Sequence, residues 1–338
     1  MSAPQEKNDA RIEKKKKKDP LAREGLVPEW KQPEPYFESS EGAAEKMARY
    51  GFNKPWRVMP DDKKEPVHKK ASTKGALVAV HPDAIVIGTE AGAASRKWDV
   101  PYLFIIGPLT LMFYFMAYKF EMPRLHYYDK YMNELLDNPH FGTQAFLFIS
   151  SILAAALGTF FVIFMWRNIF HTPPDYPILF NRKTRIVTFF KRIQPSFFKF
   201  WKPIIVSNPI SLSWDDAKIR TYRVFMSRFG KTFYYALWLQ MLWGGKDGNP
   251  KRLKDYIAVG FEGYEEDDGL LQLWEHIRRY MEEDGPPIQP GERLRKPANK
   301  RKPLEFPPEI IAAAGGPALS EAEVLALAEL PTEQAAGA

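Results

Sequence analysis

Five side chains of the types that bind metal ions lie between residues 119 and 142: His126, Asp129, Glu134, Asp137 and His140. Imidazole and carboxylate groups are common zinc ligands. Their spacings of three, five, three and three residues match no known ligand motif. The stretch YYDKYMNELLDN instead reads as a short amphipathic helix with its apolar side towards lipid. We therefore expect neither a metal site here nor a bound cofactor.

Catalytic motifs are missing from the sequence. It holds no GxSxG elbow, HExxH pair, Walker lysine loop or GxGxxG after a strand. The segment Gly244–Gly248 reads as a turn, because it lacks the spacing that cradles a phosphate. The absence of cysteine excludes a thiol nucleophile and thiolate metal ligands. We therefore expect no catalytic residues and no enzyme, although a site assembled from distant residues stays open.

A basic β-hairpin is predicted around residues 177–191, where PILF and RIVTFFK flank the turn Asn181–Thr184. Its cations lie a short linker after an apolar run, within a Debye length of lipid headgroups. We interpret them as lipid-facing, and the alternative is a solvated face. The residues are Arg182, Lys183, Arg185, Lys191 and Arg192.

Aromatic side chains gather in the strand-like stretch FYYALWLQML at residues 233–242. Tyr234, Tyr235 and Trp238 form our candidate surface for a protein partner or for the N-terminal hairpin of the chain, because exposed aromatic patches often mark interaction sites. The alternative is that these rings fill the core.

Two apolar runs in the sequence are long enough to cross a membrane. Residues 100–118 and 143–166 each reach the roughly 20 helical residues that cross a bilayer. Neither run keeps the polar stripe of a soluble core helix. The mean hydropathy of the whole chain is only −0.37, so the apolar residues of a membrane protein would have to be concentrated in runs such as these. We predict a hairpin of transmembrane helices at 99–120 and 143–167, joined by a connection at 121–142.

Small residues recur along the second helix at Ser150, Ala154 and Gly158. This spacing places them on one face, where another backbone can approach closely. The partner is the first helix, a second copy or another protein, and a chance pattern stays open.

Lysine and arginine flank the outer ends of the two runs more densely than they occur in the connection. This bias places both termini in the cytoplasm. The polar first fifty residues exclude a cleavable signal peptide at the start of this sequence.

A folded cytoplasmic domain is expected at residues 172–285. Several strand-like stretches precede DDGLLQLWEHIRRYMEE, an amphipathic helix with Asp267 or Asp268 as N-cap. Such an α+β domain would be an antiparallel sheet or half-barrel closed by its C-terminal helix. The order of elements is similar to that of a pleckstrin-homology-like module.

The remaining segments are expected to contribute little core. Residues 1–75 read as a disordered basic, Pro-rich tail, in which Tyr36-Phe37, Tyr50, Phe52 and Trp56 could dock onto a folded surface. Residues 76–90 read as a separate β-hairpin. Residues 286–338 read as a flexible tail with a short helix at 320–330, opened by the capping box of Ser320 and Glu323.

Three stretches carry a resemblance to a known family: PILFNRKTRIV from Pro177, then Ser213-Trp214-Asp215, then LQLWEHIRRYME from Leu271. They resemble a bacterial family of two-span membrane proteins, named only as a domain of unknown function and often encoded near type VI secretion genes. The resemblance implies the bacterial inner (plasma) membrane, a periplasmic connection and an adaptor or immunity role. It supplies no catalytic residues.

Two classes of function therefore remain. The first is a membrane-anchored binding or assembly protein, whose partners are the lipid bilayer and a protein or a second copy of the chain. The second is a membrane-bound hydrolase or transferase with an unrecognised site. A deep polar pocket with convergent ionisable groups would favour the enzyme. We expect the first class and no nucleic-acid partner, with Lys14–Lys18 solvated or in contact with anionic lipid.

Overall fold

The computed structural model describes residues 25–38, 54–89, 99–121, 141–170, 173, 175–193, 202, 205–228, 231–246, 248–264, 267–296 and 304–329. The chain divides into two compact units. Residues 91–174 and 192–207 form what we call the helical unit, and the remaining segments form the sheet unit.

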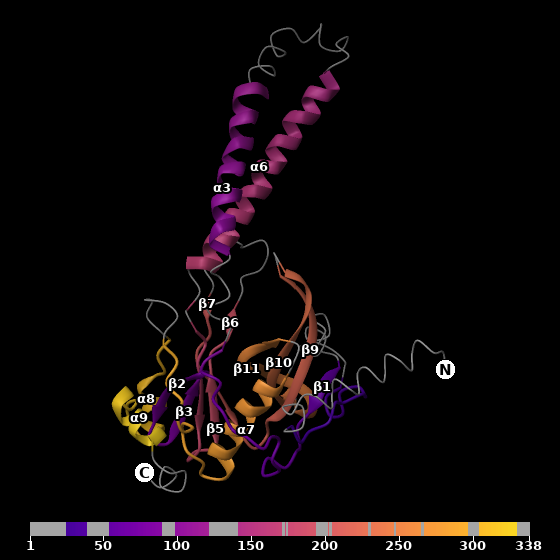
Figure 1. Cartoon of the computed structure of the whole chain (residues 1–338). Helices are drawn as coiled ribbons and strands as arrows, with labels where there is room; N and C mark the ends of the chain where they lie inside the picture. The colour runs from indigo at the N-terminus through magenta and orange to yellow at the C-terminus, as the bar shows by residue number, and fades with distance from the viewer. Residues whose placement is uncertain are drawn as a thin grey trace, which may run out of the picture. The chain divides into compact units, whose positions relative to one another are not determined.

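Two apolar helices dominate the helical unit. Helix α3 (Asp99–Met116) continues into the π-helical turn η3 (Ala117–Glu121), and α6 spans Phe141–Phe170. The helices lie side by side (Figure 1). The same unit holds the short antiparallel pair β6 (Arg192–Ile193) and β7 (Ile205–Val206).

Close packing between α3 and α6 depends on Gly158. A Cβ atom at this position would lie 2.3 Å from Oγ1 of Thr110 on α3. One residue later, the Thr159 hydroxyl lies 3.0 Å from the hydroxyl of Tyr114. Ser150, by contrast, donates to the Leu147 carbonyl of its own helix. Gly158 therefore permits the close approach predicted for it, beside a hydroxyl contact that the small-residue pattern did not include.

One described helix is long and apolar enough to cross a membrane, over Phe146–Arg167. The apolar part of α3, Leu103–Lys119, is shorter. Length and composition alone are weak support, since the core helix of a soluble protein passes the same test. Here, however, only 6% of the apolar window is buried, and rings such as Phe104 and Phe146 are more than two-thirds exposed.

Two antiparallel sheets make up the sheet unit. The four-stranded sheet has the order β1-β9-β10-β11, and the five-stranded sheet has the order β2-β3-β4-β5-β8. The strands of the first are β1 (Pro55–Val58), β9 (Lys218–Arg228), β10 (Lys231–Lys246) and β11 (Asn249–Tyr264). Those of the second are β2 (Leu77–His81), β3 (Ala84–Ile87), β4 (Ile178–Asn181), β5 (Ile186–Phe189) and β8 (Ile210–Ser213).

Helix α7 (Asp268–Glu282) shares one apolar core with both sheets (Figure 1). Its Leu273, Trp274 and Ile277 are at most 1% exposed and belong to the same cluster as core residues of each sheet. Trp274 stacks on Trp214, with ring centres 5.3 Å apart. The expected single sheet closed by a helix is thus replaced by two sheets that share one helix.

The expected boundaries of the folded unit are too narrow at the N-terminal side. The hairpin β2–β3 is not separate, because β3 pairs with β4 from Ala84↔Asn181 to Ile87↔Ile178. Residues 54–75 are not a disordered tail, because β1 pairs with β9 and the buried Val67 donates its N–H to the Glu275 carboxylate of α7. Both errors arise because these partners lie far away in the sequence.

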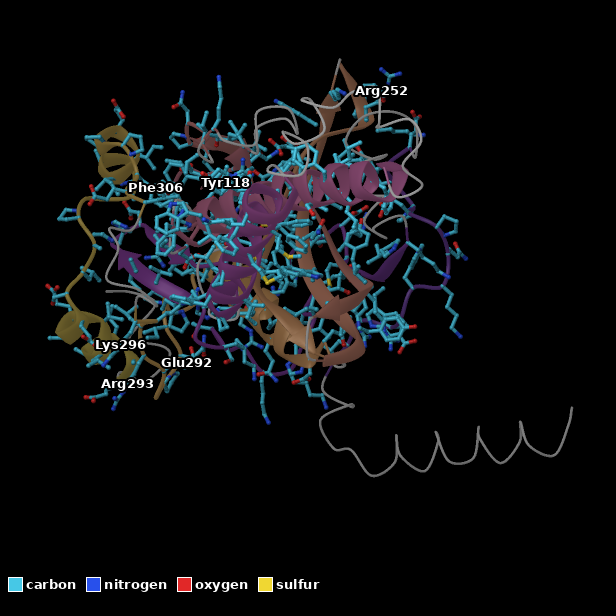
Figure 2. The ribbon with its side chains drawn as sticks, turned by 90° about the horizontal axis from the view of Figure 1, so that it is seen from above. Tyr118, Arg252, Glu292, Arg293, Lys296 and Phe306 are labelled. Carbon is cyan, nitrogen blue, oxygen red and sulfur yellow. The ribbon has the colours of Figure 1, made fainter. Side chains whose placement is uncertain are left out.

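The C-terminal segment is also part of the fold. Helices α8 (Pro308–Ala313) and α9 (Glu321–Glu329) follow the core, and the capping box forms between Ser320 and Glu323. Val324 of α9 is buried in the main core, and Phe306, labelled in Figure 2, stacks on Phe190 with ring centres 5.0 Å apart. Residues 304–329 are therefore not a flexible tail.

The sequence suggested that the side chain of Asp267 could cap α7, but in the structure it makes no capping hydrogen bond. Its carboxylate pairs instead with Arg57 of β1, whose Nη2 lies 3.1 Å from Oδ1. The ion pair ties β1 to the start of α7, so a cross-element contact takes the place of the local cap.

A carboxylate clamps the two points where the chain leaves and re-enters the sheet unit. Thr89, just after β3, donates its N–H to Oδ1 of Asp175 at 2.7 Å, and Arg295 Nη1 lies 3.0 Å from Oδ2. Burial raises the pKa of Asp175, opposed by the charge of Arg295. The entire helical segment between β3 and β4 is therefore an insertion between two paired strands.

Candidate partner-binding pocket

Residues 25–38 pack against the four-stranded sheet. Phe37 is buried in a cluster with Tyr222, Leu242 and Leu253 on the sheet face opposite the main core. The prediction of docking onto a folded surface is confirmed for Tyr36-Phe37 and for Trp56, which packs against the main core, whereas Tyr50 and Phe52 lie outside the described residues.

A buried ion pair fixes this segment. Arg220 of β9 is 1% exposed, and its Nε and Nη2 both lie 3.2 Å from Glu34 carboxylate oxygens. Burial raises the pKa of the neighbouring Tyr222, and the charge of Glu34 adds to the effect. Breaking such a pair leaves one buried charge uncompensated, so it holds the segment in one position.

A pocket of about 600 Å³ opens between this segment, β1 and the loop that follows it. Its wall includes Trp30 and Tyr36, with the buried Arg220 among the lining residues. Rigid proline rings form much of the remainder, at positions 28, 35, 60 and 66. Three exposed carboxylates complete the lining: Asp61, Asp62 and Glu65.

The charges of the lining are partly used within the fold. Lys218 Nζ lies 2.9 Å from Asp61 and 4.9 Å from the ring centre of Tyr36. Oδ1 of Asp62 accepts the N–H of Lys64, which closes a tight turn. The pocket therefore combines aromatic rings, pre-set proline backbone and acidic groups, a surface suited to an extended peptide with a cationic side chain.

Helix α7 supports the loop beneath the pocket. Arg278 donates to the carbonyls of Lys63 and Lys64 at 3.3 and 3.1 Å, and to both oxygens of Glu275. Burial by itself would raise the pKa of Glu275. The hydrogen bonds that its carboxylate accepts from Arg278, Arg279 and the Val67 N–H outweigh burial and lower this pKa. The ionised pair is therefore a fixed point from which the loop is positioned.

His276 lies in the core and not in the pocket. The sequence marks it as an ordinary helix residue, yet it is fully buried, with Nδ1 3.0 Å from Nε2 of Gln289. Burial lowers its pKa to about 4. The imidazole is thus neutral at pH 7 and contributes to packing.

The predicted basic hairpin does not present a continuous basic face. Arg185 pairs with Asp215 and Glu282, with its Nε 3.0 Å from Asp215. Lys191 pairs with Asp255 of β11. Both cations pair with carboxylates of the sheet unit, so less of their charge is available to lipid than the sequence suggested, and the lipid-facing role of the set stays a prediction.

The other three basic residues lie in different surroundings. The Arg182 guanidinium stacks 5.1 Å from the ring centre of Tyr280. Lys183 is 71% exposed and pairs with Asp83, and Arg192 belongs to the helical unit.

The predicted aromatic surface is divided between the two faces of β10. Tyr235 shares the face of Leu237 in the main core, and Trp238 lies on the opposite face, because side chains alternate along a strand. The side chain of Tyr234 lies outside the described residues. The described rings therefore do not form a single surface.

Residues 155–306 match a family of unknown function, DUF6708. The matched range runs from within α6 through α7 and includes Arg220, but not the segments 25–38 and 54–66 that form most of the pocket. No curated protein and no solved structure matches the chain.

Among the described residues, no three His, Asp or Glu side chains approach closely enough to hold a metal ion. The residues from His126 to His140 lie outside the described ranges.

Sequence analysis did not identify Arg220 or the pocket carboxylates Asp61, Asp62 and Glu65 as site residues. An arginine that alternates with apolar residues along a strand is expected to face solvent.

Proposed function

We propose that this protein is a membrane-anchored binding protein. The helical unit spans the bilayer as a two-helix hairpin, and the sheet unit captures a partner segment in the pocket. The observation that carries the proposal is the exposure of the apolar side chains of α6, together with its close packing on α3 through Gly158. A lipid environment would cover such surface, which water would not.

The pairing of the helices supports a second span. The apolar part of α3 is shorter than that of α6, and a short span is tolerated when the bilayer thins or the helix packs against a neighbour. The distribution of Lys and Arg supports both termini in the cytoplasm. The proposal includes a bacterial inner membrane and an adaptor or immunity role near type VI secretion, which rest on the resemblance of the hairpin and α7 sequences.

Binding is favoured over catalysis by the composition of the pocket. Prolines and aromatic rings line much of it, Arg220 is paired, and Asp61 is held by Lys218. No described lining residue is histidine, so the ordinary general base is not in place here. A pleckstrin-homology-like fold is not part of the proposal, because the sheet unit has two sheets around one helix.

Reporter fusions test the topology. Alkaline phosphatase fused near Asn133 should be active, and a fusion at Ala338 should be inactive. Activity from the Ala338 fusion would refute the cytoplasmic placement of the sheet unit.

Site-specific photo-crosslinking tests the pocket. A crosslinker placed at the exposed Pro35 should capture one defined partner in cells, whereas the same group at the exposed Lys296 should not. Charge reversal at Asp62 and Glu65 should abolish the Pro35 adduct. An adduct that survives the reversal would show that the pocket is not the binding site.

A further inference from the structure

A guanidinium is clamped between two aromatic rings in the sheet unit. Cζ of Arg223, on β9, lies 4.7 Å from the ring centre of Trp56 and 4.0 Å from that of Tyr235. The two rings come from β1 and β10, the strands on either side of β9. Arginine suits such contacts, because its guanidinium interacts favourably with the faces of aromatic rings.

The guanidinium of Arg223 has an unused hydrogen-bond donor. Its Nε is buried without a hydrogen-bond partner, and no described carboxylate pairs with it. Four other arginines of the sheet unit each have a carboxylate partner: Arg57, Arg220, Arg278 and Arg295. Leaving a buried charged donor unsatisfied is costly, so the unused Nε–H of Arg223, held between strands by two aromatic contacts, points to a ligand.

A second polar atom without a partner lies on the same face. Thr221 precedes Arg223 by two residues on β9, and its Oγ1 is also buried without a hydrogen bond. Both residues face the side of the sheet that carries Leu237 and Leu239, their partners across the β9–β10 ladder. The core-facing side of this sheet thus carries two consecutive polar positions with unused hydrogen-bonding capacity.

We propose that Arg223 binds a carboxylate of an acidic peptide segment from a protein partner. The two aromatic rings hold the guanidinium in place, its Nε–H is unused, and the paired N–H groups of a guanidinium match the two oxygens of a carboxylate. The stack supplies one positive charge, which complements a carboxylate monoanion better than a phosphate dianion. This site is distinct from the pocket, whose carboxylates favour a cation, and it does not depend on the membrane anchor.

Peptide binding by the full-length protein in detergent tests the proposal. The probe is a fluorescein-labelled hexaglutamate peptide, followed by anisotropy at low ionic strength, with a hexaglutamine peptide for comparison. Hexaglutamate should bind and hexaglutamine should not. Arg223→Gln should weaken binding about tenfold, the expected scale for a charge-assisted hydrogen bond. Arg223→Lys should also weaken it, because an ammonium keeps the charge but lacks the planar fork.

The control is Arg293→Gln, which removes the same charge from the exposed Arg293, labelled with its neighbours Glu292 and Lys296 in Figure 2. It should change the affinity less than about twofold, since surface charges act weakly and non-specifically. If it weakens binding as much as Arg223→Gln does, the protein attracts the peptide through net charge alone and the proposal fails.

Competition identifies the ligand chemistry. Glutarate should displace the hexaglutamate probe from the parent protein, and inorganic phosphate at equal concentration should not. Displacement by phosphate alone would overturn the carboxylate assignment, as would absence of hexaglutamate binding. If Arg223→Gln fails to fold, Tyr235→Leu removes one side of the stack at a ring that is 43% exposed, and it should weaken binding in the same way.

Discussion

Truncation of Trp274 should destabilise the sheet unit strongly, because this ring joins the two sheets through one core. The indole is 1% exposed and stacks on Trp214 at 5.3 Å. Burying about 200 Å² of aromatic surface at about 25 cal/mol/Å² contributes about 5 kcal/mol. Alanine retains a small part of this, and the lost stacking and the new cavity add to the cost. We expect Trp274→Ala to lower the free energy of unfolding by about 3–5 kcal/mol.

Urea denaturation of the full-length protein in detergent, followed by the β-sheet circular dichroism signal, measures this change. Trp238→Ala is the matched control, since Trp238 is half-buried on the opposite sheet face. It should cost less than about 2 kcal/mol. A loss below about 1 kcal/mol for Trp274→Ala, or equal losses for both variants, would contradict the view that α7 forms the centre of a shared core.

Three further predictions concern other contacts. His276 has a folded-state pKa of about 4 against about 6.5 in the unfolded chain, so protons favour unfolding. Stability measured by urea midpoints should fall as the pH drops from 6.5 towards 4, by on the order of 3 kcal/mol, and His276→Gln should flatten this profile. Glu34→Gln leaves Arg220 buried without its counter-charge and should cost about 3 kcal/mol, seen as faster proteolysis within residues 25–38. Gly158→Val should separate α3 from α6 at Thr110 and reduce disulfide formation between cysteines introduced at Tyr114 and Thr159 in this cysteine-free chain.

The elements that sequence patterns predicted well are those defined by local residues. The hairpin of β4 and β5 follows from two β-branched runs around Asn181–Thr184, and α7 follows from its helical spacing of apolar residues. The capping box of α9 forms between Ser320 and Glu323, three residues apart. In each case the stabilising partner lies within a few residues, so a short window contains the whole signal.

The features that were missed depend on distant partners. Residues 54–75 look too polar to fold, yet the Glu275 carboxylate and the Arg278 guanidinium of α7 bind their backbone. The same holds for Arg185, whose charge is visible in the sequence but whose partners Asp215 and Glu282 are not. A charge pattern alone does not reveal whether a cation faces lipid or a carboxylate of the same fold.

The candidate site was partly accessible from the sequence. Tyr36-Phe37 among prolines correctly indicated a docking segment. The opposite wall of the pocket was not predicted, because Asp61 and Asp62 follow a strand that itself depends on pairing with β9. Arg223 was also missed, because stacking on Trp56 and Tyr235 requires three strands to meet.

The insertion of the helical segment between β3 and β4 affects how the protein matures on the ribosome. About 90 residues separate the two paired strands, and at roughly 5–20 residues per second β3 waits several seconds for its partner. During this interval the β2–β3 hairpin has an open edge that is prone to wrong pairing. Association of α3 with α6 brings the ends of the inserted segment closer and lowers the entropic cost of closing so long a loop. Assembly of the helices would then precede completion of the five-stranded sheet, so the helical unit acts as an internal folding aid for the sheet unit.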